Sequence, residues 1–292
     1  MKKGIQLAIL TTCISGFSIF ASKIFLTNMD PVLFTTLKNL IVAIILSGIV
    51  LSSHKQKLFQ LTLKQWKQLL FIGIIGGSIP FALFFIGLSK ISALEGALIH
   101  KSLFIWVAIM GMFFLRERIN RYQILGYIIV TAGALFLGVE SYSDLSIGHI
   151  MVLIATFFWS VEYIIAKKIL HTIPSSIVAW GRMFFGVIVL LGISAYQGLI
   201  PQIATLDSSQ VLAIFSGAVF LIGYVLTWYA ALSKSQASLV SLVLAASPII
   251  TGVLSSIFIS HAFPQSNMLS WVIIIFGIVL TIVFGRLRHA ST

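Results

Sequence analysis

Six charged or titratable side chains stand inside stretches that are otherwise apolar enough to cross a membrane. They are Lys38, Glu95, His100, Lys101, Glu162 and Arg182. A charged side chain at the centre of a bilayer costs about 2.5–3.5 kcal/mol on insertion scales, so residues of this kind usually have a use. Carboxylate, ammonium and guanidinium groups at that depth can bind charged groups of a solute, or they can carry a proton.

Glu162 lies about two helical turns inside the end of its apolar segment. Trp159 and Ala166 stand three positions before it and four after it, and they therefore share its helix face. A carboxylate alone in a medium of low dielectric tends to be neutral. Three interpretations are open: Glu162 binds a cationic group of a solute, it loads and releases a coupling proton, or it forms a structural ion pair with Lys101 or Arg182.

Lys101 lies near the middle of its segment, too deep for a stem of about 6 Å to reach the interface. It must face a carboxylate or a wet cavity. His100 points about 100° away from it and is either a packed polar residue or a proton relay. Glu95 lies near the outer end, where the helix dipole favours a solvated carboxylate. A role for Glu95 in gating or coupling stays open beside that interpretation.

Lys38 and Arg182 stand at matching positions of the internal repeat described below. Each lies seven residues into its helix, and the two helices enter from opposite membrane faces. We expect the two residues near the two mouths of a cavity, where gates could close alternately. Anchoring to lipid headgroups or helix ends is the alternative. Arg182 could also clamp a carboxylate with two hydrogen bonds, which Lys38 could not do.

Aromatic side chains cluster along the same segments. Most should pack or form interface belts, but those at the depth of a cavity could stack on an apolar group or hold a cation. We therefore predict a solute-binding set consisting of Glu162, Lys101, Trp159, Arg182, Tyr163, Trp228 and Phe85. The predicted gating or coupling set consists of Lys38, Glu95 and His100.

Composition identifies the elements that must position these residues. The chain is 59% apolar and 9% charged, against about 45–50% and about 25% in globular proteins. Its net charge of +12 comes from basic residues that punctuate apolar runs, which favours membrane topology over nucleic acid as the explanation. Strands of a membrane barrel would show alternating polar and apolar residues, and the sequence shows no such alternation. We predict an all-α integral membrane protein of ten transmembrane helices, over 4–26, 31–52, 67–89, 92–115, 121–139, 147–170, 175–197, 209–232, 235–259 and 268–286.

Short connections make neighbouring helices antiparallel, and the basic residues then fall on one side. Lys90 is the one clear loop cation on the other side. Both termini are therefore expected in the cytoplasm. The stretch Gly73, Gly76, Gly77, Ser78 and Pro80 marks the third helix as a candidate hinge.

The chain is also duplicated at a fixed offset of 144 residues. Leu88-Ser89-Lys90 returns as Leu232-Ser233-Lys234. Further matches join Gly4 to Gly148, Thr12 to Thr156, Lys23 to Lys167, Gly73 to Gly217, Gly133 to Gly277 and Lys38 to Arg182. A unit of five helices leaves the membrane on the side opposite to its entry, so the second copy must be inverted. We predict repeats over 1–140 and 145–288.

Several residues carry a family resemblance. Trp159-Ser160 with Lys167, and Ser15-Gly16 with Lys23, are similar to a first-helix signature. Glu117, Gln123, Gly126 and Gly133 are similar to a fourth-to-fifth helix pattern, and Pro248 matches a mid-helix proline. The chain resembles the drug/metabolite transporter superfamily, EamA type, over essentially its whole length. It departs from the pattern where Phe104 replaces the first-repeat proline and His261 replaces the second-repeat glutamate.

The resemblance implies a small-solute carrier, often an exporter of amino acids or related metabolites. Helices one to four of each repeat would line the cavity, with the fifth peripheral. We predict a secondary carrier with alternating access in a bacterial-type plasma (inner) membrane, exporting a zwitterionic, amino-acid-like metabolite. Its partners would be the solute and membrane lipid. A coupling proton, and a homodimer packed through Gly133 and Gly277, stay open.

Three alternatives remain at this point. A cationic or quaternary-amine solute could bind Glu162 and an aromatic cage, although Lys101 in the same cavity would oppose it. A membrane enzyme or lipid-handling protein would need a catalytic cluster, and only Glu117 between Arg116 and Arg118 offers a weak one. A non-transport scaffold would need no cavity. No nucleotide-binding loop, zinc spacing or Ser-His-Asp arrangement is visible, so we expect no catalytic residue, metal or cofactor.

Overall fold

The computed structural model describes residues 2–26, 29–138, 145–261 and 265–286, and within these ranges every regular element is helical. The first half contains α1 (Lys2–Phe25), α2 (Pro31–Ser53), α3 (Lys55–Phe59), α4 (Leu63–Gly77), α5 (Ile79–Lys90), α6 (Ala93–Lys101), α7 (Leu103–Phe114) and α8 (Arg121–Gly138). The second half contains α9 (Ile147–Ile169), α10 (Ser175–Tyr196), η1 (Ile200–Thr205), α11 (Ser208–Lys234), α12 (Ala237–Leu244), α13 (Ser247–Ser255), η2 (Ser256–Ser260), η3 (Gln265–Asn267) and α14 (Met268–Arg286).

Eight helical segments of the described chain are long and apolar enough to cross a membrane. Three of them join two helices across a break: Leu63–Lys90, Ala93–Phe114 and Ala237–Ser260. Two shorter apolar helices, within α8 and α14, complete the set. The apolar helices indicate an integral membrane protein, because hydrocarbon stabilises segments whose backbone groups are all paired internally.

Three helices that we predicted as single segments are interrupted, one of them at the stretch that we predicted as a candidate hinge. The helix predicted over 67–89 breaks at Ser78, and Pro80 follows as the second residue of α5. The helix predicted over 235–259 breaks before Pro248. Both breaks follow from a proline, which cannot donate to the carbonyl four residues earlier. The helix predicted over 92–115 breaks at Ser102. No proline is present there, since Phe104 stands at the position that matches Pro248.

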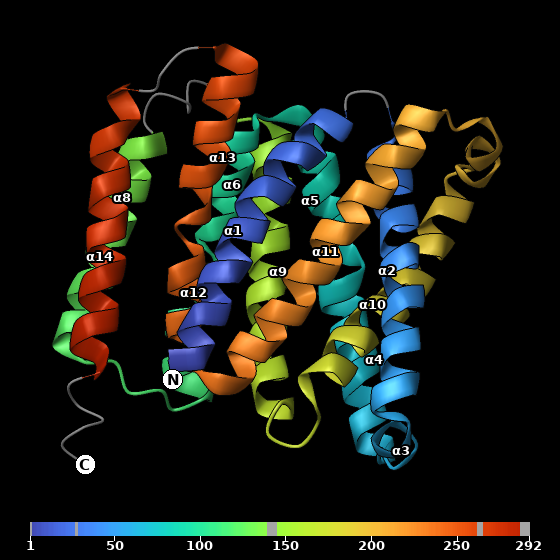
Figure 1. Cartoon of the computed structure of the whole chain (residues 1–292), viewed down its shortest axis with the longest axis horizontal. Helices are drawn as coiled ribbons and strands as arrows, with labels where there is room; N and C mark the ends of the chain where they lie inside the picture. Colours follow the sequence, from blue (N-terminus) through green and yellow to red (C-terminus); the bar gives the residue numbers. More distant parts are fainter. Residues whose placement is uncertain (1, 27–28, 139–144, 262–264, 287–292) are drawn as a thin grey trace.

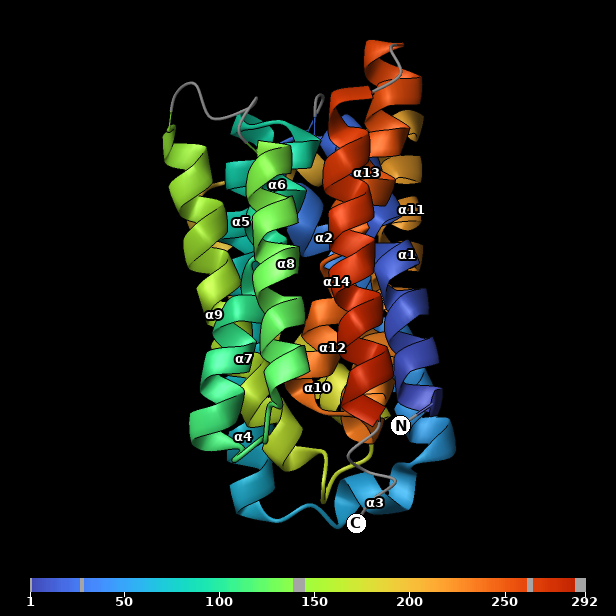
Figure 2. The same cartoon turned by 90° about the vertical axis from the view of Figure 1, so that its left-hand side faces the viewer.

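The two halves repeat the same contacts in opposite directions. α1 packs along α11, and α9 packs along α5. The Lys23 Nζ donates to the carbonyls of Leu88 (2.9 Å) and Ser89 (3.2 Å). Lys167 does the same to Leu232 (2.6 Å) and Ser235 (2.7 Å). α1 begins and α14 ends at one end of the molecule, whereas α9 begins at the other (Figure 2). The segment between the predicted repeats, 141–144, lies outside the described residues.

α8 and α14 lie side by side at one edge of the molecule (Figures 1 and 2). A side chain added at Gly133 would meet Ile274 and Ile273 of α14 at 2.8 and 3.0 Å. One added at Gly277 would meet Val130 and the carbonyl of Gly126. These glycines therefore allow α8 and α14 to approach closely within one chain.

α4 and α10 cross at close range. A Cβ at Gly186 would lie 2.4 Å from the carbonyl oxygen of Gly77, whereas a Cβ at Gly192, on the same helix, would meet nothing within 4 Å. Gly186→Ala should lower the free energy of unfolding by about 1–3 kcal/mol, because the backbone of α4 must shift. Thermal unfolding of the purified protein in detergent measures the effect. Gly192→Ala is the matched control and should leave stability within about 0.5 kcal/mol. Equal melting temperatures for the two variants would contradict this packing.

Candidate functional site

A free backbone carbonyl organises the middle of the molecule. Pro80 has no N–H, so the carbonyl of Gly76, four residues earlier, has no donor within its helix. Two side chains from the other half donate to it instead: the Nε of Arg182 (3.1 Å) and the Nε1 of Trp159 (2.8 Å). The break between α4 and α5 therefore fixes where side chains of α9 and α10 meet.

Glu162 and Arg182 lie in contact beside this carbonyl. The Arg182 Nη1 is 3.9 Å from the Glu162 Oε2, and the two side chains are 1% and 0% exposed. The hydroxyl of Tyr229 donates to the Glu162 Oε1 (2.6 Å). A Cβ at Gly76 would lie 2.4 Å from the Glu162 Cγ, so only glycine lets the carboxylate lie against α4. Of the two partners predicted for Glu162, Arg182 is therefore the one in contact.

Aromatic rings surround this pair. The guanidinium of Arg182 lies 5.3 Å from the ring centroid of Phe81 and 5.8 Å from that of Tyr163. The Tyr163 hydroxyl forms a hydrogen bond with the Tyr224 hydroxyl (3.0 Å). The centroid of the Tyr163 ring lies 4.3 Å from that of Trp228. All of these side chains are buried. The predicted site residues Trp159, Tyr163 and Trp228 thus gather around Arg182, and Phe85 stacks on Phe81 at 6.3 Å.

Lys101 is buried on α6, next to this cluster. Its Nζ donates to the hydroxyl of Ser15 (2.8 Å) and lies 3.4 Å from the Nδ1 of His100. The ring of His100 lies 4.7 Å from Trp159, which connects α6 to the aromatic wall. The Nε2 of His100 makes no hydrogen bond within the described residues. Lys101 makes no ion pair within them either, so of the two surroundings that we considered for it, a carboxylate and a wet cavity, the carboxylate is not found there.

We expected Lys38 near a mouth of the molecule, but it lies in the interior. It is 3% exposed, and its Nζ lies 3.6 Å from the ring centroid of Phe85 and 4.8 Å from that of Phe34. Lys38 and Arg182 also share Phe81, at 5.7 and 5.3 Å, so both lie in the middle of the protein. The expectation of opposite mouths fails in this conformation because the stem of Lys38 carries its charge into the interior, whereas long cationic side chains usually reach toward water.

Glu95 caps its own helix. Its carboxylate accepts from the backbone N–H of Ser92 (2.7 Å), and its Oε1 lies 3.4 Å from the Nε2 of His149 on α9. This capping box satisfies free donors at the start of α6. Glu95 therefore makes its contacts at the helix end, apart from Glu162 and Arg182.

Glu117, the weak candidate for an enzyme, also serves a helix start. Its carboxylate accepts from the backbone N–H groups of Ala237 (2.6 Å) and Ser238 (3.1 Å), and from the Ser238 hydroxyl. A carboxylate is stabilised there by the first N–H groups of α12 and by the helix dipole. Glu117 thus joins the end of the first half to the second.

Sequence reasoning missed Gly76 and Tyr229 as members of the site. The pattern Gly76-Gly77-Ser78 before Pro80 carried a usable signal, because it leaves a carbonyl without a donor. Tyr229 belongs to the aromatic cluster of the sequence but could not be distinguished from its other members, since aromatic residues in membrane helices are common at interfaces.

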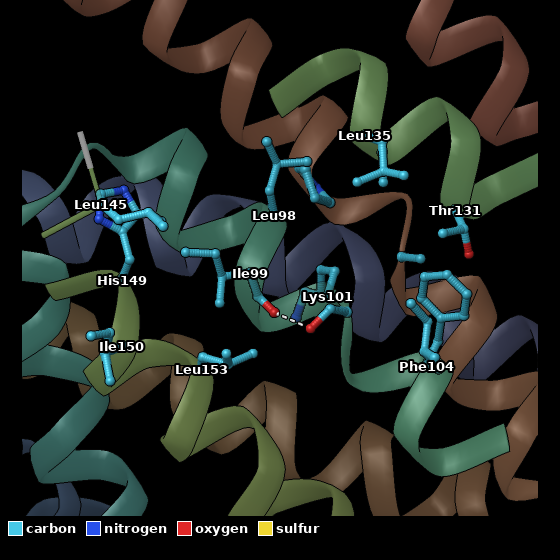
Figure 3. A pocket seen from close by; sticks show the side chains of 15 residues that line it. Leu98, Ile99, Lys101, Phe104, Thr131, Leu135, Leu145, His149, Ile150 and Leu153 are labelled. Atoms are coloured by element: carbon cyan, nitrogen blue, oxygen red, sulfur yellow. Dashed lines mark hydrogen bonds between the residues drawn. The ribbon is translucent and has the colours of Figure 1, made fainter. Parts of the chain in front are cut away.

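A separate crevice of about 340 Å³ opens between α6, α7, α8, α9 and the α12–α13 break (Figure 3). Its walls are mostly apolar, with His149 and Thr131 among the few polar residues. Lys101 contributes to its lining, but its ammonium is bonded to Ser15 of α1. The crevice therefore offers little to pair with a charged solute.

Comparison with known proteins shows which family the chain resembles and which solved structure shares its fold. A sequence model of the EamA-like transporter family matches residues 2–139 and again residues 146–283. An uncharacterized transporter of Archaeoglobus fulgidus is 25% identical over 97% of this chain and 99% of its own length. Another from Clostridium kluyveri is 24% identical over 96% and 93%. The Bacillus subtilis uncharacterized transporter YoaV is 22% identical over 82% of each chain. One crystal structure, 16% identical, superposes with a TM-score of 0.73 over 95% of this chain and 96% of that one, which shows a shared fold.

The contact between Glu162 and Arg182 can be tested by a double-mutant cycle. Glu162→Gln and Arg182→Met should each destabilise the protein, because each leaves one buried charge without its partner. The double variant should be more stable than the sum of the single effects predicts, by about 1–3 kcal/mol. Unfolding of the four proteins in detergent gives the coupling free energy. A coupling near zero would mean that the two side chains do not interact.

Proposed function

Because this chain belongs to the EamA-like transporter family, we propose that it is a secondary carrier for a small, zwitterionic, amino-acid-like metabolite. The proposal includes ten membrane-spanning helices in two inverted five-helix repeats, within 1–140 and 145–288. It also includes a bacterial-type plasma membrane with both termini in the cytoplasm, and export, which the family resemblance suggests. Inverted repeats suit a carrier, since a central site can then open to either side by the same movement.

The observation that carries the proposal is the buried contact of Glu162 with Arg182 and Tyr229. A carboxylate and a guanidinium enclosed by rings offer complementary partners to the two charged ends of a zwitterion. In our assignment the solute ammonium binds Glu162, and its carboxylate binds Arg182 or Lys101. Trp159, Tyr163, Trp228 and Phe85 receive its apolar part.

Access to this site would depend on the broken helices. α4–α5, α6–α7 and α12–α13 are each interrupted partway along a candidate membrane segment, so each offers a point at which the segment can bend. Glu162 is enclosed in this conformation. Exposure to either side therefore requires movement of these helices.

A carrier of cations is less well supported. The buried charged side chains of the described residues are Lys38, Lys101, Arg182 and Glu162, so positive charge is in excess there. That excess repels a solute whose only charge is positive. The rings of Phe34, Phe81 and Phe85, which could form a cage for an amine, already surround the ammonium of Lys38. A non-transport scaffold is also less well supported, because the chain belongs to a family of transporters.

The proposal predicts ligand-dependent stability. Among amino acids, amines and sugars, an amino acid at 100 times its Kd should stabilise the purified protein by about 2.7 kcal/mol. Glu162→Gln and Lys101→Ala should each abolish that shift. Lys64→Ala removes an exposed lysine of α4 and should preserve it. Thermal unfolding in detergent is the measurement.

Two results would count against the zwitterion. A shift with amines alone that survives Lys101→Ala would indicate a cation carrier. An amino-acid shift that is unchanged in both Glu162→Gln and Lys101→Ala would place the solute elsewhere in the molecule.

A further inference from the structure

The buried charges at the centre of the protein do not balance. Lys38 (3% exposed), Lys101 (3%) and Arg182 (1%) are all buried, whereas Glu162 (0%) is the single buried carboxylate among the described residues. Removing a cation from water is costly unless an anion and hydrogen bonds compensate for the lost hydration. The site therefore lacks negative charge.

Lys38 is the cation with the fewest partners. Arg182 has Glu162 and the Gly76 carbonyl, and Lys101 has the Ser15 hydroxyl. Among the described residues, Lys38 makes no hydrogen bond or ion pair, and its ammonium faces only three phenylalanine rings. An ammonium can donate three hydrogen bonds, and a ring face accepts a cation without satisfying them all.

The surroundings of Lys38 hold its charge toward the binding cluster. On the α11 side, a Cβ at Gly217 would lie 3.0 Å from the Lys38 Cδ, so glycine makes room for the lysine stem. On the other side, its Nζ is 5.7 Å from the centroid of Phe81, the ring that Arg182 also covers at 5.3 Å. An anion bound at Lys38 would therefore be close to the Glu162–Arg182 pair.

We propose that Lys38 receives the carboxylate of the solute, and that the solutes of this carrier are carboxylates with an apolar or aromatic side chain. The inference rests on the proposed carrier function and refines it. In the earlier assignment Lys38 had a gating role, and Arg182 or Lys101 held the carboxylate. Here Arg182 stays with Glu162, and Trp159, Tyr163 and Trp228 still receive the apolar part of the solute.

The free protein gives the first test. Lys38→Met keeps the apolar stem and removes an ammonium that lacks a hydrogen-bond acceptor. The melting temperature of ligand-free Lys38→Met should therefore equal or exceed that of the wild type. Lys64→Met, at an exposed position of α4, should leave it unchanged. A clearly lower melting temperature for Lys38→Met alone would show that Lys38 serves the fold, and would overturn the proposal.

Ligand binding gives the second test, with three probes that share a phenyl ring. Phenylalanine carries both charges, 3-phenylpropionate lacks the ammonium, and phenethylamine lacks the carboxylate. The wild type should bind the two carboxylates and not the amine. Lys38→Met should weaken their binding at least about tenfold, because a charge-assisted hydrogen bond is lost. Lys64→Met should bind as the wild type does. Lys38→Arg, which introduces the residue of the matching repeat position, should retain part of the affinity.

The outcomes separate this inference from the proposed function. If Glu162→Gln abolishes phenylalanine binding and Lys38→Met leaves it intact, the zwitterion carrier stands and the role of Lys38 is overturned. If only 3-phenylpropionate binds, and does so through Lys38, the carboxylate site stands and the zwitterion is wrong. Failure of the wild type to bind either carboxylate would overturn the carboxylate site.

Discussion

The contact between Glu162 and Arg182 is the interaction on which the centre of this protein depends. A carboxylate inside a membrane protein must be paired or neutral, and here Arg182 and the Tyr229 hydroxyl are its partners. Arg182 is itself positioned by the carbonyl of Gly76, which is free because Pro80 cannot donate to it. One interruption in a helix of the first half thus decides where charges of the second half meet. The same interruption gives that helix a point at which it can bend.

The fold was largely predictable because the chain is a duplication. The offset of 144 residues indicates equivalent helices, and the structure places Lys23 and Lys167 in equivalent contacts with the ends of α5 and α11. Prolines account for the breaks before Pro80 and Pro248, although we predicted a hinge only at the first. The break at Ser102 could not be predicted, because no proline or glycine marks it. At this break the Ser102 hydroxyl donates to the carbonyl of Ile99 (2.7 Å), a local bond that often bends helices but that not every serine makes.

The residues of the site were easier to predict than the contacts between them. A charge in an apolar run is conspicuous, so Glu162, Arg182 and Lys101 could be identified from composition alone. Which charge meets which depends on helix rotation and on the direction of long stems. For that reason Lys38 was expected near a mouth and lies in the centre. The duplication does not predict these contacts. It pairs Lys38 of α2 with Arg182 of α10, but it pairs Lys101 with an alanine, Ala245.

Counterflow through the wild-type protein tests the central claim, that this cluster is the solute site of a carrier. Vesicles containing the protein are loaded with unlabelled phenylalanine and diluted into labelled phenylalanine. A carrier that exchanges its solute at one alternately exposed site should accumulate label transiently above its external concentration. The account predicts this overshoot in the wild type and its loss in Glu162→Gln that inserts and folds normally. No overshoot in the wild type, or an equal overshoot in both proteins, would contradict it.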